Sequence, residues 1–139
     1  MKLSDEMKAN LDQRFTALID CLNSTKDIRK CMSLLPSIAY PIRALLDISQ
    51  DPSDMFVALL ITQQLSFVQS TYDGNSNTWY EVNEENVQKL RKCLATFAED
   101  LKNSIKNDDE EGVINATKAF FSKFHQLART TSSDVKSSA

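Results

Sequence analysis

Residues 83–106 read NEENVQKLRKCLATFAEDLKNSIK, and this stretch decides the fold class. Asn83 is a residue type that caps helices, and Glu84 and Glu85 suit the positive end of a helix dipole. Apolar residues then recur every three or four positions: Val87, Leu90, Leu94, Phe97, Leu101 and Ile105. Such a long, regular stripe predicts an amphipathic helix of the kind that packs in antiparallel bundles.

Two more long helices are predicted upstream. Residues 5–23 follow the capping residue Ser4 and carry a similar apolar stripe. Residues 52–72 follow Asp51, with Pro52 at the first helical position, where its missing N–H costs nothing. The first half of this second helix is apolar on every face, so we expect it to be covered all round.

Two prolines divide the stretch between these helices. Pro36 is expected to end a short helix, because the residue before a proline is pushed out of the α region. Pro41 is expected in the first turn of a second short helix that ends before residue 50.

The rest of the chain supplies one more helix and two polar segments. Asp73-Gly74 predicts the end of helix 52–72, followed by a polar loop that re-enters the fold at Trp79. Residues 110–129 predict the last long helix. Residues 130–139 are mostly Ser, Thr and small polar residues, which predicts a disordered tail or linker.

These segments predict an all-α fold. A chain of 139 residues with only two glycines and three prolines is poor in the turns that sandwiches and barrels require. We predict a single helical domain over residues 1–129, an antiparallel bundle of about six helices, four long and two short. A superhelical array of helix pairs is the alternative architecture.

Catalytic and metal-binding patterns are weak in this sequence. His125 is the only histidine, and no carboxylate stands three or four residues from it. Cys21, Cys31 and Cys93 lack the spacing of a zinc site, which suggests reduced thiols in a cytoplasmic or nuclear protein. We therefore expect no enzymatic activity, no cofactor and no bound metal.

Hydropathy gives no sign of a membrane protein. The first residues lack the apolar core of a signal peptide. The longest apolar run, Met55 to Ile61, is far shorter than the roughly 20 residues that span a bilayer. No membrane insertion is expected.

Charge and aromatic residues single out the middle of the chain. Residues 51–82 contain four acidic and no basic side chains, and Trp79 and Tyr80 stand together in them. We predict a groove near residues 52–82 that takes a basic amphipathic helix or peptide, in a non-catalytic interaction or scaffold domain. The partner-binding residues are predicted to be Thr62, Ser66, Gln69, Tyr72, Asp73, Trp79, Tyr80 and Glu81.

Two other functions remain open. A helical nucleic-acid-associated protein would use the basic residues of 89–92 and 118–129, although residues 83–139 hold nine basic and nine acidic side chains, which cancel. A homo-oligomerisation module would pair the stripes of residues 5–23 and 83–106 with those of a second copy.

Overall fold

The computed structural model describes residues 1–138, apart from the side chains of residues 74–82, Val135 and Ser138. Its described part is all-helical, as predicted, and no strand occurs in it. The elements are α1 (Asp5–Ser24), the short 3-10 helix η1 (Ile28–Cys31), α2 (Leu34–Ile48), α3 (Pro52–Val82), α4 (Glu84–Lys106) and α5 (Glu110–Ser138).

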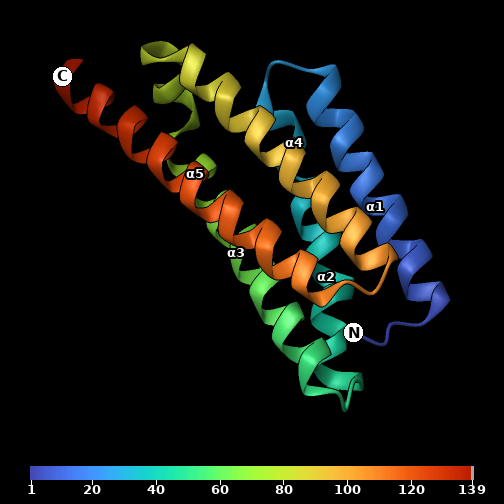
Figure 1. The fold of residues 1–139 in the computed structure, drawn as a ribbon. Coiled ribbons are helices and arrows are strands. Elements are labelled where there is room, and N and C mark those ends of the chain that lie inside the picture. Colours follow the sequence, from blue (N-terminus) through green and yellow to red (C-terminus); the bar gives the residue numbers. More distant parts are fainter. Residues whose placement is uncertain (139) are drawn as a thin grey trace.

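The helices pack side by side around one core (Figure 1). Each of the five α-helices has two main neighbours, in the cyclic order α1, α4, α5, α3, α2 and back to α1. The predicted stripe of α4 is buried in this core, and Phe97 of that stripe stacks on Phe120 of α5 with ring centroids 4.2 Å apart. The apolar stripe of α1 is buried from Leu11 onward, and Met7 at its start is partly buried.

Two of the predicted helix starts are confirmed by their caps. The Ser4 hydroxyl accepts a hydrogen bond from the Met7 backbone N–H at 3.1 Å, and α1 begins at Asp5. The Asn83 side chain accepts from the Asn86 backbone N–H at 3.0 Å, and α4 begins directly after it. Each cap satisfies one of the N–H groups that a helix start leaves without a partner.

The prediction of two short helices divided by Pro36 and Pro41 is wrong. A 3-10 turn, η1, replaces the first of them, and both prolines lie within the single helix α2. Pro36 is the third residue of α2, where a backbone N–H has no helical partner in any case. Pro41 lies inside α2, and Arg14 of α1 compensates for the helical hydrogen bond that it interrupts.

The predicted stop at Asp73-Gly74 is also wrong. Helix α3 continues to Val82, so the polar loop expected at residues 75–78 is part of its backbone. A glycine inside a helix costs only about 1 kcal/mol relative to alanine. It ends a helix when it takes a positive φ, and no described glycine does so.

Helix α5 extends beyond residue 129, where the sequence predicted a disordered tail. Thr131 is fully buried, and its hydroxyl accepts a hydrogen bond from the Asn86 side chain at 3.3 Å. One turn later the Asn83 side-chain amide donates to the Asp134 carboxylate at 2.6 Å. These contacts fix Thr131 and Asp134 against the start of α4, although composition alone predicted disorder for this segment.

One stretch is long and apolar enough to cross a membrane, by length and composition only. It is Ile28–Ile48, in which charged residues interrupt the apolar sequence, so it contains no long unbroken apolar run. In this fold it forms η1 and α2, and Leu35, Ile38 and Ile42 on it lie in the core. The core helix of a globular domain meets the same criterion.

Candidate interaction surface on α2 and α3

Exposed apolar side chains gather on two helices. Six large apolar side chains are exposed among those that the structure describes, and only Phe121 lies outside α2 and the first half of α3. The other five are Tyr40, Ile48, Met55, Phe56 and Leu59. The expectation that the first half of α3 is covered all round is therefore wrong for this chain alone.

The outward face of α3 changes its chemistry along the helix. Met55, Phe56 and Leu59 expose 37%, 51% and 54% of their surface. On the following turns the exposed residues are polar, with Gln63 and Ser66 continuing the same line. A helix of a monomeric protein normally presents a polar outer face over its whole length, so the apolar half marks this surface as unusual.

A groove lies between α2 and α3, next to this apolar face. It has a volume of about 270 Å³, and Tyr40, 80% exposed, stands at its edge. Arg43 of α2 crosses it, with the guanidinium 3.5 Å from the Ser66 hydroxyl of α3. The lining residues are Leu35, Pro36, Ala39, Tyr40, Arg43, Leu65, Ser66 and Gln69. Pockets for drug-sized ligands range from roughly 300 to 1,000 Å³. This smaller groove has room for one or two side chains.

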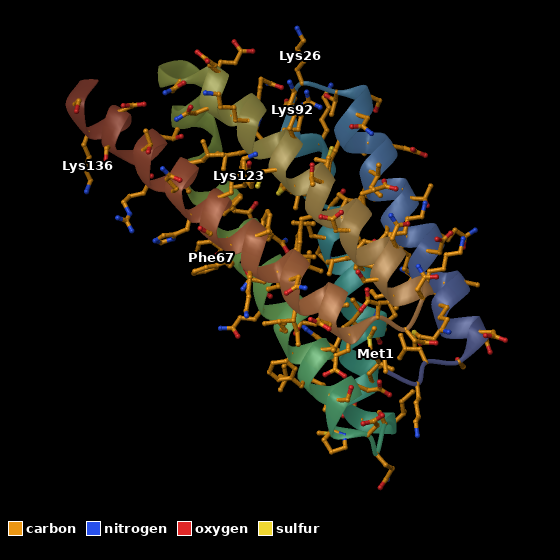
Figure 2. All side chains as sticks on the ribbon, in the orientation of Figure 1. Met1, Lys26, Phe67, Lys92, Lys123 and Lys136 are labelled. Atoms are coloured by element: carbon orange, nitrogen blue, oxygen red, sulfur yellow. The ribbon has the colours of Figure 1, made fainter. Side chains whose placement is uncertain are left out.

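The opposite edge of α3 is closed by α5. The ring of Phe67 lies where these two helices meet (Figure 2), 5.6 Å from the Phe124 ring and 6.3 Å from that of Phe121. This aromatic contact fills the interface between α3 and α5. The accessible apolar surface of α3 therefore lies on its outer side and toward α2.

The structure brings together some of the predicted partner-binding residues. Ser66 and Gln69 both line the groove, and Asp73 is exposed one turn beyond Gln69. Thr62 and Tyr72 are buried instead. The Thr62 hydroxyl donates to the Ala58 carbonyl at 2.8 Å, and the Tyr72 ring packs 6.0 Å from the Phe124 ring.

The remaining predicted residues cannot be placed on this surface. Trp79, Tyr80 and Glu81 lie outside the side chains that the structure describes. The loop that was expected to carry them belongs to α3.

Sequence reasoning missed the contribution of α2. The predicted break between two short helices at Pro36 and Pro41 separates Tyr40 from Arg43, so the sequence predicts no common face with α3. The sequence did contain one usable signal, since the run from Met55 to Ile61 places apolar residues on every face of the helix, more than one buried side can cover. That excess was interpreted as core, although it equally describes a surface that another molecule covers.

Acidic side chains stand at both ends of the surface. Asp47 lies one turn beyond Arg43 on α2, and Asp73 one turn beyond Gln69 on α3. Both are exposed, and neither forms an ion pair within the described part of the chain. Arg43 is the one charged residue that lines the groove itself.

Several basic residues of the alternative nucleic-acid site make contacts within the protein. The Arg91 guanidinium donates to the Leu22 carbonyl and, at 2.8 Å, to the Gln88 side chain. Lys89 lies 3.6 Å from Glu85. Arg129 contacts the ring of His125 at 3.2 Å, and this ring stacks on Phe121. Lys92, Lys118 and Lys123, also exposed, are the cations of the two predicted segments that make none of these contacts.

The stripes proposed for self-association lie inside the molecule. Helices α1 and α4 pack against each other, and most apolar residues of both are buried. Pairing with a second copy would therefore have to use another surface. Among the described residues, no group of three or more His, Cys, Asp or Glu side chains is arranged to hold a metal ion.

Comparison with known proteins adds no further constraint. No protein family, no curated protein and no solved structure matches this chain.

Proposed function

We propose that this protein is a non-catalytic interaction domain that binds an amphipathic helix of a protein partner on the surface formed by α2 and α3. The observation that carries this proposal is the clustering of five of the six exposed large apolar side chains on these two helices. Fully burying such a side chain stabilises an assembly by about 1.5–3 kcal/mol, so partial burial of several of them supplies a driving force.

The shape of the surface favours a helix as the occupant. At about 1.5 Å per residue, α3 extends roughly 27 Å from Met55 to Asp73, which matches five turns of a partner helix. The groove beside Tyr40 would accept one anchoring side chain of that helix. Grooves that bind amphipathic helices use such anchors at intervals of three or four residues.

The charges favour a partner with lysine or arginine near both ends of its apolar stripe. Asp47 and Asp73 stand at opposite ends of the surface without intramolecular ion pairs. Complementary charges at the rim of an interface mainly increase association rate and fix orientation. Arg43, in the groove, would favour an acidic or carbonyl group of the partner at that one point.

The finer architecture belongs to this proposal. We take the helices to form an antiparallel bundle, supported by the three-residue connections between α2 and α3 and between α4 and α5. In such a bundle α2 and α3 form a hairpin whose outer side is free for a partner.

A peptide titration tests the proposal. The probe is a fluorescent 18-residue peptide with a leucine stripe and lysines beside it, measured by anisotropy against the full chain. Leu59→Ser and Phe56→Ser are expected to weaken binding at least tenfold. The matched control is Phe121→Ser, which removes an exposed apolar ring from α5 and is expected to leave the affinity unchanged.

The charge component has its own arm in this titration. Combining Asp47→Asn with Asp73→Asn is expected to weaken binding and reduce its dependence on salt. Replacing the peptide lysines by glutamates is expected to weaken binding further and to reverse the effect of salt, because like charges then face each other. Asp20→Asn, on the exposed side of α1, is the control substitution. If Leu59→Ser and Phe121→Ser bind the lysine peptide equally, the proposed surface is wrong.

A further inference from the structure

Two cysteines are in contact, one on the last turn of α1 and the other at the end of η1. The Cys21 and Cys31 sulfur atoms are 2.7 Å apart, and both are free thiols. A disulfide bond is about 2.05 Å long, so the sulfurs need to approach by less than one ångström to bond. The third cysteine, Cys93 on α4, is also a free thiol, and it pairs with neither of them.

The two thiols differ in access to solvent. Cys21 is half-buried on the last turns of α1, whereas Cys31 is completely buried. Burial, and after it the contact with Cys21, raise the pKa of the Cys31 thiol to about 12. The thiolate is the reactive form of cysteine. Cys31, which stays protonated and buried, therefore does not react directly with a soluble oxidant. An oxidant therefore meets Cys21 first.

We propose that Cys21 and Cys31 form a reversible thiol–disulfide modification site that takes hydrogen peroxide as its oxidant. The Cys21 sulfur attacks one peroxide oxygen, the O–O bond breaks, and a sulfenic acid and water result. The Cys31 sulfur then attacks the Cys21 sulfur, the S–O bond breaks, and the departing hydroxide leaves as water with the Cys31 proton. Two thiols are oxidised to one disulfide, and one peroxide is reduced to two waters.

Neighbouring contacts hold this corner in place during the second step. The Arg91 guanidinium of α4 donates to the carbonyl of Leu22, next to Cys21. The Gln88 side chain of α4 donates to the Lys26 carbonyl at 2.9 Å, and Lys26 itself points away from the molecule at this end (Figure 2). These contacts hold the connection between the two cysteines against α4, so the Cys31 sulfur is expected to stay beside the sulfenic acid and to react before further oxidation.

Peptide mapping of the full chain tests the site. The reduced protein is treated with a small excess of hydrogen peroxide, digested with trypsin without reduction, and analysed by mass spectrometry. Cys21 and Cys31 fall on separate tryptic peptides, residues 15–26 and 31–43. The expected result is one linked pair of these peptides, a loss of two hydrogen atoms from the intact mass, and full reversal by dithiothreitol.

Variants identify the order of the steps. Cys31→Ser is expected to accumulate a Cys21 sulfenic acid that dimedone traps, and Cys93→Ser is expected to form the disulfide as the wild type does. Three results in the wild-type map would each overturn the proposal. They are oxygen addition at Cys21 with Cys31 still reduced, oxidation of Cys93 in preference to the pair, and no change in thiol content. The wild-type map decides the question even if a cysteine variant fails to fold.

Discussion

The guanidinium of Arg14, on α1, donates a hydrogen bond to the backbone carbonyl oxygen of Ser37, on α2, at 2.8 Å. In a regular helix this carbonyl would accept from the N–H four residues later, which is position 41. Position 41 is a proline and has no N–H. Arg14 therefore supplies, from another helix, the donor that Pro41 lacks.

This relationship predicts a measurable coupling between the two residues. Arg14→Met should lower the free energy of unfolding by about 1–2 kcal/mol, since hydrogen bonds from charged donors are worth roughly 1.5–3 kcal/mol. In a Pro41→Ala background the new N–H can serve the Ser37 carbonyl, so the same substitution should cost about 1 kcal/mol less. Urea denaturation of the four proteins in this double-mutant cycle measures the difference.

A control separates this bond from the other contact of Arg14, whose Nε donates to the Asn10 side chain at 2.6 Å. Asn10→Ala should show no coupling with Pro41→Ala. Equal costs of Arg14→Met with and without Pro41 would contradict the account of the interrupted helix.

The end of α5 should contribute to stability. A chain ending at residue 129 loses the buried Thr131 and the hydrogen bond between Asn83 and Asp134, and its free energy of unfolding should fall by at least about 1 kcal/mol. A chain ending at residue 135 keeps both and should unfold like the full chain. If all three proteins melt at the same temperature, residues 130–139 form a disordered tail, as composition predicted.

Two adjacent phenylalanines should differ strongly in their effect on stability. Phe120 is 3% exposed and stacks on Phe97, whereas Phe121 is 46% exposed. Phe120→Ala should cost about 3–5 kcal/mol, as truncations in a packed core do. Phe121→Ala should cost less, about 1–2 kcal/mol, because the ring is half-exposed and its described ring contacts are with Phe67 and His125. Thermal unfolding of the two variants measures this contrast, and similar losses would show that the face of α5 is assigned incorrectly.

The Asp27 carboxylate should make a small, pH-dependent contribution to the free energy of unfolding. A hydrogen bond from the Arg29 side chain lowers the pKa of Asp27 below its ordinary value. A lowered pKa stabilises the folded state at pH values above the unfolded-state pKa of about 3.9. This contribution disappears as pH falls through the folded-state pKa.

Asp27→Asn should therefore reduce stability at pH 7 by less than about 1 kcal/mol, because the pair is partly exposed. The difference from the wild type should vanish near pH 2.5. Urea midpoints at the two pH values measure it, with Asp20→Asn as the control. A difference that is the same at both pH values would assign the effect to capping of η1 and not to charge.

Local patterns in the sequence predicted a helix correctly where no contact with a distant residue was needed to explain it. The Asn83 cap and the stripe behind it defined α4 correctly, because a cap and a period of three to four residues both lie within one helix. The same applies to Ser4 and α1.

Prediction from the sequence failed where a distant residue offsets a local cost. Pro41 is tolerated inside α2 because Arg14, 27 positions earlier, reaches across from α1. The end of α5 is held by Asn83 and Asn86 from α4. Such long-range compensation leaves no periodic signal in the sequence. The exposed half of α3 was misjudged for another reason, since an apolar face looks the same in a sequence whether its own chain or a partner covers it.

The most direct measurement of the central claim is site-specific photo-crosslinking in cells that express the chain. A benzophenone amino acid replaces Leu59 on the proposed surface, and in a second protein it replaces Gln13, which is exposed on α1. The account predicts a crosslinked protein partner from position 59 and none from position 13. The purified partner should then bind the Leu59→Ser variant at least tenfold more weakly than the wild type. Equal crosslinking from both positions, crosslinking only to a second copy of the chain, or unchanged binding of Leu59→Ser would contradict it.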